Sequence, residues 1–207
     1  MTRRIAAALL TTAAGTTALA GTTSVDLDGL SDDSFITSVD GVSIAVNNPD
    51  PDGEQIARVW NYTNRPQLLA GGHQTPFTVG NVADTSPLKG IYVLGTNPSL
   101  IENDRPGVDF VFTFDAPVSE FQFTVVDVDL PEEIDPASGA AYDVRSDGAT
   151  VGSVLFSDLV DPEKDAFDSS IEFGNGSANQ FTVIATDFGV SSFDSVELNL
   201  GGSGTVN

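Results

Sequence analysis

The chain has no cysteine, and its 207 residues include a single histidine, a single tryptophan and only eight lysine and arginine residues. The absence of cysteine excludes disulfides, thiol nucleophiles, thiolate zinc sites and iron–sulfur clusters. Because His73 is the single histidine of the chain, a metal site made of several histidines is excluded. No G-x-S-x-G motif is present to indicate a Ser-His-Asp hydrolase, so we interpret His73 as an ordinary loop residue.

Acidic residues greatly outnumber the basic ones. The chain contains 30 Asp and Glu residues, which gives a net charge of −22 at pH 7. A surface this acidic repels nucleic acid and anionic membranes, so we exclude both as partners. It suits divalent cations, a salty habitat or simple solubility, and acidity alone does not select among these.

Long apolar runs are also missing, and the first residues have the pattern of a sorting signal. Arg3 and Arg4 precede a weakly apolar run, and Ala18-Leu19-Ala20 supplies an A-x-A cleavage pattern. We therefore expect residues 1–20 to be a cleavable signal peptide, exported by the Sec route with the twin-arginine route as the alternative. The remaining residues, 21–207, carry six basic and 30 acidic residues, a net charge of −24. These 187 residues are enough for one domain with a single core. We expect a secreted or cell-surface protein that does not itself insert into a membrane.

Apolar and polar residues alternate with a period of two along nearly the whole chain, which predicts strands rather than helices. The expected strands are 24–30, 34–39, 42–47, 56–62, 90–95, 108–115, 120–129, 140–146, 150–157, 169–174, 179–187 and 193–200. Asp40-Gly41 and Asp147-Gly148 each lie between two alternating runs, which predicts hairpins with type I′ turns. Asn175-Gly176 repeats this signal.

About ten or more short strands separated by Gly, Pro, Asn and Asp turns predict an all-β fold. We expect a two-sheet antiparallel sandwich of jelly-roll-like form, with a closed barrel as the alternative. Residues 65–89 are rich in Pro and Gly and are expected to be an irregular excursion.

Three stretches, VDFVFTFDAPVSEFQFTVVDVD, DGATVGSVLFSD and FDSVELNLGGSGTVN, resemble an exported bacterial β-sandwich domain. Such domains recur in surface and matrix proteins that carry a PEP-CTERM sorting tag. The resemblance covers residues 24–207 and implies an extracellular or surface-anchored, largely non-enzymatic domain. The sequence to Asn207 shows no Pro-Glu-Pro, terminal apolar helix or basic tail, so a truncated chain and a freely secreted chain both stay open.

The stretch FQFTVVDVDLPEEID runs from a hydrophobic strand into a series of acids. Phe121, Phe123, Val125, Asp127 and Asp129 share one face of a strand, so the two aspartates are expected at the rim of the core. Carboxylates at that position need water or a shared cation, and calcium accepts several flexible oxygen ligands. A solvated strand tip is the alternative. The candidate calcium ligands in this stretch are Asp127, Asp129, Glu132, Glu133 and Asp135.

A second candidate for calcium binding is NNPDPDGE. Asn48, Asp50 and Asp52 before Gly53 resemble the first half of a calcium loop, with oxygen ligands at alternate positions. The position of the closing bidentate glutamate holds Val59, so an ordinary acidic turn is the alternative. A third acidic run, residues 157–170, has no ligand-like order and is interpreted as a solvated loop.

Trp60 and Tyr62 share a strand parity with Arg58 and could stack sugar rings, with the arginine near the hydroxyls. A core position for Trp60 is the alternative, against which the shared parity with an arginine counts slightly. The function we expect is an acidic, calcium-stabilised binding or structural module that contacts extracellular polysaccharide or a surface or matrix protein, without enzymatic activity. A glycan-active hydrolase or lyase of sandwich fold is the rival, and a structural filler domain is the third possibility.

Overall fold

The computed structural model describes residues 21–22, 25–27, 29–47, 54–61, 80–82, 89–93, 108–126, 141–174, 177–200 and 205–206. The strands in this part of the chain are β1 (Gly21–Thr22), β2 (Phe35–Ile36), β3 (Ser38–Val39), β4 (Val42–Asn47), β5 (Ala57–Asn61), β6 (Lys89–Tyr92), β7 (Asp109–Val126), β8 (Ala141–Ser146), β9 (Ala149–Leu155), β10 (Ala178–Ile184), β11 (Phe193–Asn199) and β12 (Thr205–Val206). The described helices are α1 (Phe156–Val160) and the 3-10 helix η1 (Ala185–Phe188). With five and four residues, neither is long enough to cross a membrane.

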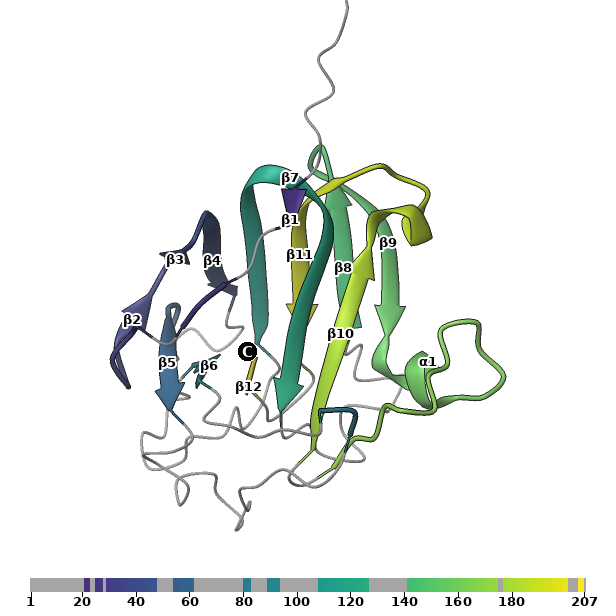
Figure 1. Ribbon diagram of the computed structural model, residues 1–207, viewed down its shortest axis with the longest axis horizontal. Helices are drawn as coiled ribbons and strands as arrows, with labels where there is room; N and C mark the ends of the chain where they lie inside the picture. Colours follow the sequence, from purple (N-terminus) through teal and green to yellow (C-terminus); the bar gives the residue numbers. More distant parts are fainter. Residues whose placement is uncertain are drawn as a thin grey trace, which may run out of the picture.

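Strand β7 is a single long strand that bends back on itself (Figure 1). Its two arms therefore belong to different sheets. Its first arm, residues 109–114, pairs with β4 and β11. Its second arm, residues 118–126, pairs with β10 and β12. Ala116 and Pro117 lie exposed at the bend. A proline has no N–H for a ladder, so it fits where pairing is interrupted.

The two arms of β7 give two sheets. One sheet has the order β3-β4-β7-β11-β8-β9, and the other has the order β10-β7-β12-β6-β5-β2. All these pairs are antiparallel, and only β1 runs parallel, beside the second arm of β7. The prediction of an all-β, two-sheet, mostly antiparallel architecture is therefore confirmed.

The core fills the space between the sheets with side chains of alternating parity. In β4, Val42, Ile44 and Val46 are buried while the residues between them are exposed. The two arms of β7 meet through their aromatic rings, because Phe121 of the second arm lies 5.5 Å from Phe112 of the first arm, centroid to centroid. Each buried phenylalanine contributes about 1.5–3 kcal/mol of hydrophobic stabilisation. The bend in β7 thus connects the two sheets and packs their inner faces against each other.

Both Asp-Gly turns have the backbone that the sequence predicted. Asp40 and Gly41 have φ of 49° and 79°, and Asp147 and Gly148 have φ of 53° and 75°. Positive φ at both central residues defines the type I′ turn, whose twist matches the flanking strands. The β3–β4 and β8–β9 hairpins confirm this prediction. The Asn175-Gly176 turn lies outside the described residues.

Other local predictions were wrong. Residues 25–27 and 29–30 are not strand, and neither are residues 169–174. The run 150–157 ends early because Phe156 and Leu159, three residues apart, turn into the core as the single turn of α1. The acidic run 157–170 otherwise forms a mostly exposed loop that Asp168 tightens by accepting hydrogen bonds from Ser170. The expected signal peptide, residues 1–20, lies outside the described residues.

Candidate functional site

Most residues singled out from the sequence lie outside the described part of the chain. These are the calcium candidates Asn48, Asp50, Asp52, Asp127, Asp129, Glu132, Glu133 and Asp135, and Tyr62 of the carbohydrate candidates. The backbone of Trp60 is described, and Arg58 is described in full. Two regions of the described chain bear on these predictions: the surroundings of Arg58, and the strand ends from which the acidic segments leave.

Arg58 lies in the middle of a cross-strand row. It is opposite Phe35 of β2 and Tyr92 of β6, while Trp60 is opposite Gly90. The other parity of β5 faces the core, because Ala57 and Val59 are 1% and 0% exposed. Arg58 therefore lies on the face of β5 that points away from the core.

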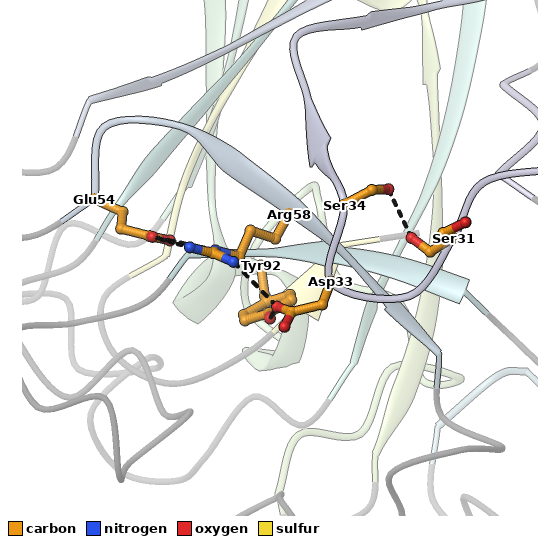
Figure 2. Close-up of polar contacts among 6 residues, drawn as sticks. All are labelled: Ser31, Asp33, Ser34, Glu54, Arg58 and Tyr92. Atoms are coloured by element: carbon orange, nitrogen blue, oxygen red, sulfur yellow. Dashed lines mark hydrogen bonds and ion pairs between the residues drawn. The ribbon is translucent and has the colours of Figure 1, made fainter.

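The guanidinium group of Arg58 is held by two carboxylates (Figure 2). Its Nε donates to Glu54 Oε2 at 2.8 Å, and its Nη2 also donates to Glu54. Its Nη1 donates to Asp33 Oδ1 at 3.3 Å, and the same oxygen accepts a 2.6 Å hydrogen bond from the Tyr92 hydroxyl. The hydrogen bonds to Glu54 and the charge of Asp33 raise the pKa of Arg58 above its ordinary value. These contacts tie the chain before β2 and β5 to strands β5 and β6.

The same guanidinium lies over an exposed aromatic ring. Its central carbon is 4.2 Å from the centroid of Phe35, whose side chain is 57% exposed. Phe35 was not singled out from the sequence. Parity could have found it, because its neighbour Ile36 faces the core and adjacent strand residues face opposite sides. The exposed ring and the two carboxylates thus contact the same guanidinium group.

The second region is one end of the sandwich, which we call the Asn47 end. It carries the end of β4, both ends of β7 and the starts of β8 and β10 (Figure 1). In the first sheet, Asn47 is opposite Asp109, and the row continues through β11 to Ala141. In the second sheet, Val126 is opposite Ala178.

The inward face of β7 stays buried up to the Asn47 end. Phe121, Phe123 and Val125 are buried, as parity predicted, and Val126 is 0% exposed between β10 and β12. The acids that follow Val126 in the sequence lie outside the described residues. The described chain therefore enters the acidic segment from a buried strand end.

The inward face of β10 changes from apolar to polar residues near the Asn47 end, where β7 ends. Val183 and Phe181 face the core, and the next residues of that parity are Asn179 and Ser177, both 0% exposed. The Asn179 side chain accepts from the Glu172 N–H at 3.1 Å and donates to the Glu172 carbonyl at 2.8 Å. The Ser177 hydroxyl has no hydrogen-bond partner in the described part of the chain.

Residues 80–82 cover the outer edge of β10. The Asn81 side chain donates to the Gln180 carbonyl at 3.0 Å and accepts from the Gln180 N–H at 2.7 Å. The approach requires glycine at position 80, where φ is 95° and a Cβ would lie 2.4 Å from the Ala178 carbonyl oxygen. This contact fixes the start of β10, and hence Ser177 and Asn179, against the end of β7.

The outer face of the first sheet carries a group of carboxylates. Glu197 is opposite Asp143, and Asp109 lies one row closer to the Asn47 end. Burial, followed by repulsion from Glu197 and Asp143, raises the pKa of Asp109. Arg145 forms an ion pair with Glu197. Within the described residues, no group of three or more Asp, Glu, His or Cys side chains is arranged to hold a metal ion.

Comparison with known proteins found no match: no protein-family profile, curated protein or solved structure is significantly similar to this chain. Any function is therefore inferred from the residues of this chain. The described chain has two features that could take part in binding. They are the exposed Phe35–Arg58 pair and the buried polar side chains at the Asn47 end.

Proposed function

We propose that this protein is a secreted or cell-surface acidic module that binds calcium for stability and contacts extracellular polysaccharide or a surface or matrix protein. The proposal includes a jelly-roll-like path of the strands and removal of residues 1–20 as a signal peptide. The all-β architecture, the net charge of −22 and the arrangement of the Asn47 end support it.

The observation that carries the calcium part is that both candidate segments are attached to the Asn47 end. Residues 48–53 directly follow β4. Residues 127–140 connect β7 to β8, so both anchors of that connection belong to this end. The two segments carry Asp50, Asp52, Asp127, Asp129, Glu132, Glu133 and Asp135, and a divalent cation relieves repulsion between like charges that come together. Calcium takes about six to eight oxygen ligands and tolerates ligands from separate loops.

Thermal unfolding of the purified protein in EDTA and in millimolar calcium, at matched ionic strength, tests this proposal. We expect calcium to raise the unfolding midpoint by roughly 5 °C or more, because a ligand that binds only the folded state stabilises it. The double variant Asp127→Asn/Asp129→Asn should lose most of that rise. The control Asp165→Asn, in the exposed loop of the third acidic run, should keep it. Identical midpoints of the wild-type protein in both buffers would refute calcium binding.

The polysaccharide part is supported by the surface around Phe35. Its exposed ring is backed by the guanidinium of Arg58, which Glu54 and Asp33 hold in place. A ring supported in this way can stack on a sugar at a small cost in conformational entropy, and neighbouring carboxylates can accept hydroxyl hydrogens. Trp60 lies two residues beyond Arg58 on the same strand parity and is proposed to extend this surface.

Co-sedimentation with a panel of insoluble polysaccharides tests the proposed contact. Phe35→Ala should weaken binding at least about fivefold, on the order of 1 kcal/mol, because the stacking surface is lost. Phe167→Ala is a matched control, since Phe167 is also exposed, at 41%, but lies in the loop after α1. Equal losses in both variants, or no binding to any polysaccharide, would contradict the contact. Release of reducing sugar from the panel would instead favour the glycan-active enzyme.

A further inference from the structure

We infer that the outer edge of β9 binds an extended segment of a partner protein that carries basic side chains. The inference rests on one part of the function proposed above, the contact with a surface or matrix protein, and not on calcium or on Phe35. Strand β9 is the last strand of the first sheet, and β8 pairs with one side of it (Figure 1). No residue of the described chain pairs with its other side. The N–H and C=O groups along that side are a template for an added strand.

The other sheet edges in the described chain are short or covered. Strands β2 and β3, which end the two sheets, have two residues each. The start of β10 is covered, because the Asn81 side chain bonds both backbone groups of Gln180. Beside it, the Val82 N–H donates to the Ala178 carbonyl at 3.2 Å. Proteins protect sheet edges in these ways, and also with prolines or charges. Strand β9 has seven residues, none of them charged and none proline.

The last four residues of β9 form the regular part of this edge. Gly152–Leu155 pair with β8 without interruption, whereas the register shift before them leaves Val151 as an extra residue, a bulge. All seven residues of β9 are exposed or partly exposed. Ser153 lies on the outer face of the sheet, opposite Asp143. A segment added to β9 therefore has a regular ladder to pair with and an open outer face for alternate side chains.

The charge of the chain around β9 is almost entirely negative. Residues 141–200, which include β8 to β11, contain 11 acidic and two basic residues. Both basic residues already form ion pairs, Arg145 with Glu197 and Lys164 with Asp158. A partner with basic side chains is therefore attracted to this part of the molecule, and an acidic partner is repelled.

Acids lie on the outer face beside β9 and beyond both of its ends. Asp143 is opposite Ser153, Asp147 is exposed in the turn before β9, and Asp158 is in α1 directly after it. Lysine or arginine side chains on alternate residues of an added strand would point to this face, and their long stems reach neighbouring strands. An antiparallel β9–β9 pair with a second copy would instead bring Asp147 of one copy near Asp158 of the other. Charge therefore favours a basic partner over self-pairing.

The probe for this edge is a fluorescein-labelled peptide of alternating lysine and valine, about nine residues long. We expect it to bind the purified protein and to slow hydrogen exchange of the amides in residues 149–155, because an added strand pairs with them. The same peptide with methylated backbone nitrogens keeps its charge but cannot donate backbone hydrogen bonds. It should therefore bind about tenfold or more weakly.

Ser153→Lys places a positive charge on the outer face of β9 and should weaken binding of the unmethylated peptide about fivefold or more. Ser43→Lys is the matched control, because Ser43 is exposed on the same face of the same sheet but lies in β4, which is paired on both sides. It should bind the peptide nearly as well as the wild type. The two variants have the same net charge, so a difference between them reports the position of the bound peptide.

Equal affinities of the two peptides, or of the two variants, would overturn the inference, because binding would then be charge attraction without strand pairing. Wild-type dimers in sedimentation equilibrium that Ser153→Lys abolishes would assign the edge to a second copy and would also overturn it. No binding of the peptide would do the same. The calcium and polysaccharide proposals would stand in each case, because EDTA and Phe35→Ala test them separately.

Discussion

At the scale of single residues, the few basic side chains are placed against the many acids. Arg58 binds Glu54 and Asp33, and Arg145 binds Glu197. Asp109 has the opposite environment, because it is partly buried and two like charges raise its pKa. The folded protein therefore holds a proton on Asp109 more tightly than the unfolded chain does, and its charged form lowers stability at neutral pH.

This environment predicts that Asp109→Asn stabilises the protein. At pH 7 the free energy of unfolding should rise by about 0.5–1 kcal/mol, the size of a cross-strand interaction between charges. As the pH falls through the raised pKa of Asp109 and below its ordinary value of 3.8, the aspartate becomes neutral in both states and the gain should disappear. Urea unfolding of both proteins from pH 7 to pH 3 measures this difference.

Asp165→Asn, an exposed loop variant with the same loss of charge, controls for the change in net charge. It should alter the free energy of unfolding by less than about 0.5 kcal/mol at any of these pH values. A gain from Asp109→Asn that is equal at pH 7 and pH 3 would contradict the electrostatic explanation.

At the scale of strands and turns, the sequence predicted what depends on local chemistry. Alternation identified β4 without error, and the Asp-Gly pairs located two hairpins. Alternation did not show that the runs 108–115 and 120–129 form one strand, because the Ala116-Pro117 bend looks like a break in the local pattern. The pairing of residues 80–82 with β10 was also beyond prediction, since it joins residues about a hundred positions apart.

Some residues of the candidate site could likewise be predicted from the sequence, and others could not. Parity placed Phe121, Phe123 and Val125 in the core, where the structure has them buried. Ser177 could not be found from the sequence, because a serine near a glycine turn normally faces water. The structure shows instead that Ser177, directly before β10, is 0% exposed.

The contact between β9 and η1 gives a prediction at this scale. A Cβ on Gly152 would lie 2.1 Å from Cδ1 of Phe188, so Gly152→Ala must displace the ring. We expect a loss of about 1–3 kcal/mol in the free energy of unfolding, typical of overpacking. In the Phe188→Ala background the same change should cost little, so a double-mutant cycle by urea unfolding should give a coupling close to the full loss.

Gly29→Ala is the control for this cycle, because its added Cβ would meet no atom within 4 Å. It should leave the free energy of unfolding within about 0.5 kcal/mol of the wild type. Equal costs of Gly152→Ala with and without the Phe188 ring would mean that the contact does not hold η1 on β9.

At the scale of the whole molecule, the charge of −22 works against the compact fold. Like charges repel more strongly in the folded protein than in the expanded chain, and salt screens that repulsion. The outer carboxylates Asp109, Asp143 and Glu197 are a local instance of it. Calcium could therefore stabilise the protein in two ways, by general screening or by occupying a site at the Asn47 end.

Ionic strength separates these two effects. In EDTA, raising sodium chloride from about 20 mM to about 1 M should raise the unfolding midpoint by several degrees and then level off, because the screening length shrinks from roughly 20 Å to about 3 Å. At about 1 M salt the general repulsion is already screened, so a further rise on adding millimolar calcium, but not magnesium, requires a site with oxygen ligands. If calcium raises the midpoint in dilute salt only, and magnesium does so equally, its action is screening, and the acidic segments at the Asn47 end contribute charge without binding an ion.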